Sequence, residues 1–193
     1  LYELGGNNGM IVSRHANIDL AVRGIVFGAV GTAGQRCTTL RRLIVHTSVY
    51  DVLMTKLKSA YASLPVGDNF KEETLVGPLI NQESVDRMQS ALEQAKAKGY
   101  TVHGGEVVEG CSVRPAIVEA TEQCDLIKTE TFAPILYVLK YSDLDEAINI
   151  HNAVPQGLSS CIFTDNVQEA ETFTSAVGSD CGIVNINIGP SGA

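Results

Sequence analysis

The sequence predicts an α/β fold with a mainly parallel open sheet and helices on both faces. Two observations favour this class. Short apolar runs alternate with amphipathic stretches along the whole chain, which is the pattern of consecutive strands and helices. No repeat, linker or low-complexity tract interrupts the alternation, so all 193 residues are expected to form one domain with a sizeable core.

Short apolar runs predict the strands. Residues 10–12 come first, residues 43–46 follow, and residues 101–108 are expected to form two short strands around a glycine-rich turn. Residues 135–139 are apolar throughout, which is typical of a strand that is buried on both faces. The remaining expected strands are residues 116–118, 158–163 and 183–188.

Amphipathic stretches that follow capping residues predict the helices. Residues 18–30 are expected to form the first, with Asn17 or Asp19 as its cap, and Ser48 is expected to cap a second that reaches about Ala62. Residues 81–98 form the third, with its charged side chains on a solvated face. Two further helices are expected from Ser142 to near His151 and from Asp165 onward.

The charge balance argues against nucleic acid as a partner. The chain has 14 Lys and Arg against 22 Asp and Glu, a formal net charge of −8, and its basic residues are scattered. The longest uncharged stretch near the start, residues 24–35, is shorter than the ~18 residues that cross a bilayer. We therefore expect neither nucleic-acid nor membrane partners.

The cysteine and histidine patterns predict neither disulfides nor a metal. Five cysteines are an odd number, none of them forms a Cys-x-x-Cys pair, and a domain of this size needs no covalent staple. Reduced thiols in a cytoplasmic protein are therefore expected. The four histidines have no neighbouring ligand at metal spacing, so no metal site is expected.

The sharpest local feature is the glycine-rich segment 31–39, which lies between an expected helix and an expected strand. It would present Cys37 on a loop, next to Arg36. Because the thiolate is the reactive form of cysteine, Cys37 is a candidate nucleophile if its surroundings favour ionisation. The alternative is that Cys37, like the other four cysteines, is a small buried apolar side chain.

Two further segments carry candidate functional side chains. Residues 130–134 would place Glu130 and Phe132 on the same side of an extended backbone, because positions two apart in a strand point the same way. Glu130 could accept hydrogen bonds from a sugar diol and Phe132 could contact a flat ring, although core packing is the simpler role for Phe132. Glu3 precedes a glycine pair, where a solvated charge is the ordinary role of a carboxylate.

Taken in order, these three segments resemble the aldehyde dehydrogenase superfamily. Glu3-Leu4-Gly5-Gly6 is similar to its glutamate signature, Gly34-Gln35-Arg36-Cys37-Thr38 to its cysteine signature, and residues 130–134 to its downstream cofactor-contact motif. The ordered set covers nearly the whole chain. Residues 31–39, 156–164 and 178–185 look most like the antiquitin branch, whose enzymes oxidise α-aminoadipic semialdehyde.

The resemblance implies a role for each candidate residue in aldehyde oxidation with NAD, or alternatively NADP. Cys37 would attack the aldehyde carbonyl to give a thiohemiacetal and then a thioester. Glu3 would activate the water that hydrolyses the thioester. Glu130 would hold the nicotinamide ribose, and Phe132 would position the nicotinamide ring.

The resemblance also implies that the substrate is a small-molecule amino-acid semialdehyde. Arg36 would grip its distant carboxylate with a planar donor fork, helped by the loop at Gly192 and Ala193. By the same comparison, residues 1–193 would be the catalytic domain, and the cofactor-binding domain and final oligomerisation segment would lie outside them. We expect the chain alone to be inactive and the full-length enzyme to be a homo-oligomer.

Two other functions stay open from the residues. A cofactor-independent cysteine hydrolase or acyltransferase would use Cys37 but has no need for a ribose acceptor beside an aromatic ring at residues 130–134. An inert interaction domain would bury Cys37, whose thiol would then react no faster than those of Cys161 or Cys181.

Overall fold

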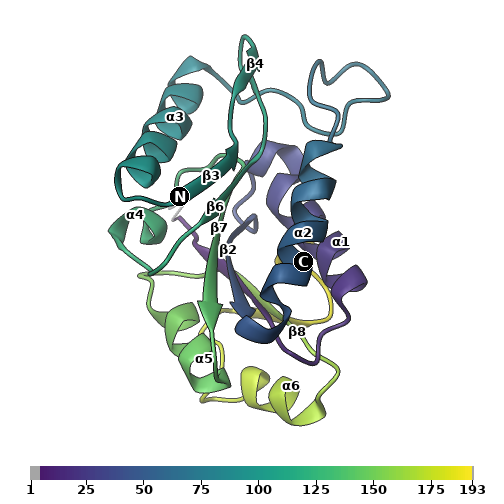
Figure 1. Cartoon of the computed structure of the whole chain (residues 1–193), viewed down its shortest axis with the longest axis vertical. Helices are drawn as coiled ribbons and strands as arrows, with labels where there is room; N and C mark the ends of the chain where they lie inside the picture. Colours follow the sequence, from purple (N-terminus) through teal and green to yellow (C-terminus); the bar gives the residue numbers. More distant parts are fainter. Residues whose placement is uncertain (1–4, 193) are drawn as a thin grey trace.

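The sheet of the computed structural model, which describes residues 5–192, has seven strands in the order β3-β6-β7-β2-β1-β8-β9 (Figure 1). Every neighbouring pair is parallel except β3 and β6. The predicted mainly parallel sheet is therefore confirmed. The strands are β1 (Asn8–Val12), β2 (Leu40–His46), β3 (Thr101–Gly104), β6 (Ala116–Glu119), β7 (Ile135–Tyr141), β8 (Ser159–Phe163) and β9 (Ile183–Ile186), with β4 (Val107–Glu109) and β5 (Ser112–Val113) in a separate hairpin.

Helices cover both faces of the sheet, as the sequence predicted (Figure 1). Helices α1 (Ile18–Val30) and α2 (Thr47–Ala62) pack on one face, and α5 (Leu144–Asn152) and α6 (Val167–Thr174) on the other. Helix α3 (Gln82–Ala97) lies beside the edge strand β3 and the short helix α4 (Asp125–Lys128). None of the helices within residues 5–192 is long and apolar enough to cross a membrane.

The central strands supply two separate apolar cores through alternate residues. Met10 and Leu43 point toward α1 and α2, whereas Ile11 and Ile44 point toward α5 and α6, and all four side chains are fully buried. Burying a side chain of this size stabilises the fold by about 1.5–3 kcal/mol. Because a shift of one residue would exchange the two faces, this burial also fixes the strand register.

Asn17 caps α1, as predicted, and its side chain accepts a hydrogen bond from the backbone N–H of Leu20 at 3.1 Å, but the caps of α2 and α5 differ from the predicted residues. Asp143, not Ser142, caps α5, and its carboxylate accepts a hydrogen bond from the backbone of Glu146 at 2.9 Å. At α2 the cap is the imidazole of His46, which accepts from the backbone N–H of Ser48 at 3.1 Å. In both helices the capping side chain belongs to the residue directly before the first helical turn, which is the position that reaches its free N–H groups.

Strand β2 begins at Leu40, three residues before the predicted start. The prediction missed this part of the strand because it contains two buried arginines. Leu40, Arg41 and Arg42 all belong to the strand, and Arg41 and Arg42 are only 4% and 0% exposed. An apolar-run criterion excludes such residues, since charged side chains are seldom buried unless they are paired. Successive strand residues point to opposite faces, so the two guanidinium groups serve different parts of the fold.

Arg42 forms hydrogen bonds that connect the segment before β1 with helix α5. Its guanidinium donates to the backbone oxygens of Asn7 at 2.7 Å and of Ile150 and His151 at 2.9 Å, and to the side chain of Gln123 at 3.0 Å. These bonds offset the cost of burying the charge. Burial, together with the charge of Arg42, lowers the pKa of His151 to about 3, so this imidazole is neutral in the folded chain at neutral pH.

We predict that acid destabilises the chain through His151. The unfolded chain takes up a proton near pH 6.5, whereas the folded imidazole does so only near its pKa of about 3, so stability is lost as the pH falls through this window. The free energy of unfolding should fall by up to about 1.4 kcal/mol per pH unit. Urea denaturation at several pH values above about 5, where carboxylates remain largely ionised, measures this dependence of the free energy of unfolding on pH. His151→Gln should flatten the slope, and an unchanged slope in that variant would contradict this account.

Candidate active site

Four loops meet at the amino-terminal edge of the parallel strands. Residues 5–7 lead into β1, residues 35–39 into β2, residues 130–134 into β7 and residues 157–158 into β8. Parallel α/β sheets usually bind ligands at the opposite, carboxyl edge, so fold class alone does not predict this location. A cavity of about 370 Å³ opens here, lined by Gly5, Gly6, Cys37, Arg87, Glu130, Thr131 and Phe132.

Three consecutive residues in the left-handed region shape the loop before Cys37. Thr32, Ala33 and Gly34 have φ values of 51°, 53° and 69°, which costs roughly 1–2 kcal/mol for a residue other than glycine. A Cβ on Gly34 would lie 2.5 Å from the carbonyl carbon of Ala133. The Cys37 loop therefore packs directly against the backbone of residues 130–134.

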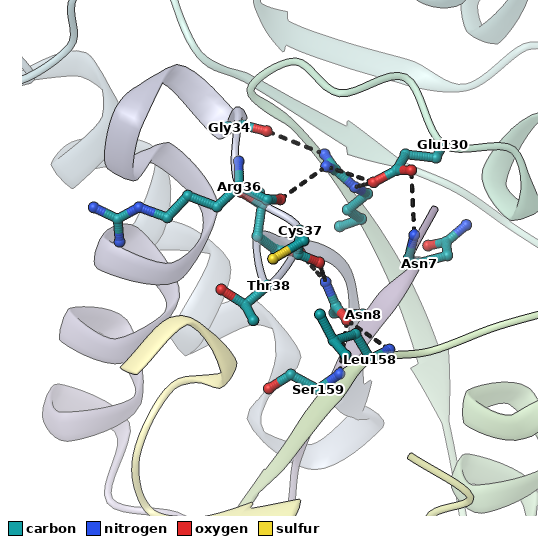
Figure 2. Close-up of polar contacts among 12 residues, drawn as sticks. Asn7, Asn8, Gly34, Arg36, Cys37, Thr38, Glu130, Leu158 and Ser159 are labelled. Carbon is teal, nitrogen blue, oxygen red and sulfur yellow. Dashed lines mark hydrogen bonds and ion pairs between the residues drawn. The ribbon is translucent and has the colours of Figure 1, made fainter. Parts of the chain in front are cut away.

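Asn8 holds this loop to the sheet (Figure 2). Its fully buried side chain donates from Nδ2 to the carbonyl oxygens of Cys37 and Thr39, both at 2.8 Å. Its Oδ1 accepts from the backbone N–H groups of Leu158 at 3.2 Å and Ser159 at 2.9 Å. One amide thus fixes both the residue that carries the thiol and the start of β8. Sequence reasoning missed Asn8, because the distant partners of a buried amide leave no local pattern.

Cys37 has the exposure that a nucleophile requires. Its side chain is exposed, whereas Cys161 is fully buried and burial raises the pKa of the Cys161 thiol. The alternative in which Cys37 is a small buried apolar side chain is therefore wrong. The backbone N–H of Cys37 donates no hydrogen bond within residues 5–192. It can therefore donate one to a negatively charged oxygen on a carbon atom that the sulfur attacks.

Glu130 and Phe132 both line the cavity, although the backbone at Phe132 is not extended as we expected. Glu130 accepts a hydrogen bond from the backbone N–H of Gly6 at 3.2 Å. Phe132 has a φ of 55°, in the left-handed region, and remains 41% exposed. Core packing is therefore wrong for Phe132. A strained backbone that exposes an aromatic ring at a cavity is a pointer to function.

Arg36 lies on the other side of the loop from that cavity. Figure 2 shows its side chain directed away from Cys37 and Glu130. Its guanidinium carbon lies 5.5 Å from the ring centroid of Phe27 on α1, in a second cavity of about 610 Å³. Within residues 5–192 no carboxylate pairs with Arg36, so an anionic ligand group can do so.

The carboxyl-terminal turn approaches the Cys37 loop from a different side. This turn, η2 (Pro190–Gly192), follows β9, and the hydroxyls of Ser191 and Thr38 lie 3.3 Å apart. Gly192, which was predicted to assist substrate binding, ends the turn. Glu3 and Ala193 lie outside the described residues, so the roles predicted for them stay predictions.

Sequence reasoning also missed two arginines at the site. Arg41 forms an ion pair with Glu130, with 2.9 Å between Nη2 and Oε1, and Arg87 on α3 lines the cavity. A charged residue between buried strand positions needs an internal partner, so the sequence around Arg41 held a usable signal. Arg87 gives no such signal, because it follows the pattern of a solvated charge on an amphipathic helix.

The fold also brings together three side chains that are able to bind metals, outside the lining of the cavity. One ligand atom each from His151, Asp180 and Cys181 lies within 4.8 Å of the others. Arg42, which donates to the carbonyl oxygen of His151 at 2.9 Å, places a buried positive charge beside this group and opposes a cation there. We therefore assign no metal to it.

The chain belongs to the aldehyde dehydrogenase family, whose family model matches residues 1–193. Solved structures share the fold described above. A lactaldehyde dehydrogenase is 31% identical with a TM-score of 0.91, and the match covers 99% of this chain and 41% of the other. A single-residue mutant of 1-pyrroline-5-carboxylate dehydrogenase from Thermus thermophilus is 27% identical with a TM-score of 0.92, covering 99% and 37%.

Two curated relatives narrow the resemblance to one branch of the family. A putative aldehyde dehydrogenase family 7 member A1 homolog from Caenorhabditis elegans is 50% identical over 100% of this chain. The α-aminoadipic semialdehyde dehydrogenase of Bos taurus is 47% identical over the same extent. The resemblance inferred from the motifs is confirmed. The chain spans 38% and 36% of the length of these two relatives.

We predict that Asn8→Ala destabilises the chain and loosens the Cys37 loop. The change leaves buried backbone groups without their partner, which should lower the free energy of unfolding by about 3 kcal/mol. The rate at which iodoacetamide alkylates Cys37, followed by mass spectrometry, should change by about threefold or more as the loop becomes mobile. Asn81→Ala is the control, because it removes only the cap of α3, worth about 1 kcal/mol. Equal alkylation rates in the two variants would contradict the role of Asn8.

Proposed function

We propose that the chain is the cysteine-bearing catalytic domain of an enzyme that oxidises an aldehyde to a carboxylic acid with NAD or NADP. The observation that carries the proposal is the single cavity that Cys37, Glu130 and Phe132 share. A nucleophile, a carboxylate and an aromatic face at one opening suit a reaction between an aldehyde and a flat cofactor. A cofactor-independent hydrolase would need neither Glu130 nor an exposed Phe132.

The residues around the cavity fit a nicotinamide nucleotide. Glu130 would accept hydrogen bonds from the ribose hydroxyls, and the exposed ring of Phe132 would contact the nicotinamide. Arg87 on the cavity wall adds a positive charge, which pairs with Glu83 at 2.9 Å in this structure. When bound, the cofactor supplies the acceptor for a hydride from the substrate carbon.

Cys37 would act as the nucleophile. Its thiolate adds to the aldehyde carbonyl carbon, and the oxyanion that forms accepts a hydrogen bond from the backbone N–H of Cys37. Loss of a hydride from that carbon leaves a thioester on the sulfur. Glu3 would then take a proton from a water molecule whose oxygen attacks the thioester, which releases the carboxylic acid and restores the thiolate.

Arg36 supports a substrate with a carboxylate at its far end. Its guanidinium lies beside Phe27 in a cavity next to the Cys37 loop, and a guanidinium binds carboxylates through two parallel hydrogen bonds. An amino-acid semialdehyde such as α-aminoadipic semialdehyde supplies both reactive groups, and the Bos taurus relative is named for that substrate. Gly192 and Ala193 would form a loop that assists Arg36.

The curated relatives are much longer than this chain, which suggests that the whole enzyme has further domains. Because the chain covers only 38% of the Caenorhabditis elegans relative, the cofactor-binding domain and the final oligomerisation segment would lie outside residues 1–193. The chain alone is then expected to be inactive. The full-length enzyme would be a homo-oligomer that acts on small-molecule aldehydes.

We predict that Cys37→Ala abolishes NADH formation by the full-length enzyme while leaving NAD binding nearly intact. Loss of the nucleophile removes the covalent route, which is worth several powers of ten in rate. Turnover is followed by the absorbance of NADH, and NAD affinity by calorimetry. Cys111→Ala, a matched change outside the cavity lining, should retain activity. A Cys37 variant that keeps more than a few per cent of wild-type turnover would contradict the assignment.

We predict that Arg36→Ala discriminates between substrates. Losing a bidentate partner should lower kcat/KM toward an amino-acid semialdehyde by ~10² or more, mostly through KM. A plain aliphatic aldehyde of similar length offers no carboxylate and should be oxidised at nearly the wild-type rate. If Arg36 only braces the Cys37 loop, both substrates will suffer equally, because a misplaced nucleophile affects every aldehyde alike. Parallel losses would therefore remove Arg36 from the substrate site.

A further inference from the structure

Arg41 contacts both the loop that carries Cys37 and the segment that carries Glu130. It lies on β2, directly after the Cys37 loop, and is only 4% exposed. Its Nη2 lies 2.9 Å from Oε1 of Glu130, and its Nε donates to the same oxygen at 3.1 Å. The planar cation therefore grips this carboxylate with two donors.

The same guanidinium holds the Cys37 loop. Its Nη1 donates to the carbonyl oxygen of Gly34 and its Nη2 to that of Arg36, each at 3.3 Å. The guanidinium carbon also lies 5.3 Å from the ring centroid of Phe132, within the range of a cation–π contact. One buried cation thus contacts the nucleophile loop, the carboxylate and the aromatic ring.

The partners of Arg41 distinguish it from a buried arginine that only supports the fold. Neither arginine lines the cavity itself, but Arg42, the next residue, donates to backbone oxygens of Asn7, Ile150 and His151, none of which lines it either. Arg41 instead joins groups on two sides of the cavity. A lysine at this position could pair with Glu130, but its compact ammonium cannot replace a fork that also reaches two carbonyl oxygens.

We propose that Arg41 is a positioning residue that fixes Glu130 and Phe132 relative to the nucleophile Cys37. This inference rests on the proposed function, because it takes Glu130 and Phe132 as cofactor contacts. Through Glu130, Arg41 sets the affinity for the cofactor. Through the two loop carbonyls, it sets the position of the thiol, so cofactor affinity and thiol reactivity depend on the same side chain.

Arg41→Met in the full-length enzyme tests this inference. The loss of the charged partner of Glu130 should raise the KM for NAD about tenfold or more. The rate of Cys37 alkylation by iodoacetamide without cofactor should change about threefold or more, because the loop loses two hydrogen bonds. Arg41→Lys keeps a cation beside Glu130 and should return the KM to within about threefold of wild type, with alkylation still altered. Arg114→Met, the same change at an exposed position, should alter neither quantity.

A double variant separates positioning from general support of the fold. If Arg41 acts on the cofactor through Glu130, adding Arg41→Met to Glu130→Gln should raise the KM for NAD by less than about twofold. Fully additive effects would overturn the proposal, as would an unchanged alkylation rate in Arg41→Met or a KM in Arg41→Lys no better than in Arg41→Met. If Arg41→Met does not fold, Arg41→Lys decides through the alkylation rate, and a wild-type rate there overturns the proposal.

Failure of the proposed function gives a different result from failure of this inference. A wild-type enzyme that forms no NADH from any aldehyde tested would overturn the function. Alkylation of Cys37 needs no turnover, so the comparison of Arg41→Met with Arg114→Met still tests whether Arg41 positions the loop. A wild-type enzyme that turns over normally, with alkylation unaffected in Arg41→Met, would overturn the inference alone.

Discussion

Gly34 presses so closely against the backbone between Ala133 and Pro134 that no side chain fits between them. This contact brings the loop that carries Cys37 against the segment that carries Glu130 and Phe132, two parts of the chain that the sequence places far apart. The φ of 69° at position 34 also favours glycine, which adopts the left-handed region without strain. The shared cavity of the candidate site therefore depends on a backbone approach that only a residue without a Cβ permits.

Two adjacent buried arginines of β2 point to opposite faces of the sheet, and Arg41 is the one that contacts both segments of this arrangement. Arg42 binds backbone oxygens of the neighbouring segments, and Arg41 binds Glu130 and the Cys37 loop. Burial lowers the pKa of both guanidinium groups, that of Arg42 to about 10, and the charge of Glu130 opposes this effect at Arg41. Both groups stay protonated at neutral pH, so each needs its oxygen partners for the strand to remain buried.

The periodic features of the fold could be predicted from the sequence, whereas the contacts that build the site could not. The spacing of apolar residues predicted α1 at residues 18–30 and the mainly parallel sheet. Burial of one helix face or of a whole strand imposes these patterns directly on the sequence. The same criterion excluded Arg41 and Arg42 from the predicted strand β2, because the partners that allow these two residues to be buried lie far along the chain. The candidate residues Cys37 and Glu130 were found through motifs, but the four hydrogen bonds of Asn8 depend on tertiary packing that no local pattern encodes.

The central claim is that nucleophile and cofactor contacts form one site, and alkylation of Cys37 as a function of NAD concentration in the full-length protein tests it most directly. We expect saturating NAD to change the alkylation rate. We also expect Glu130→Gln to shift the half-effect to a NAD concentration about tenfold higher or more, since the carboxylate would hold the ribose. A rate that does not respond to NAD, or a response identical in wild type and Glu130→Gln, would contradict the claim.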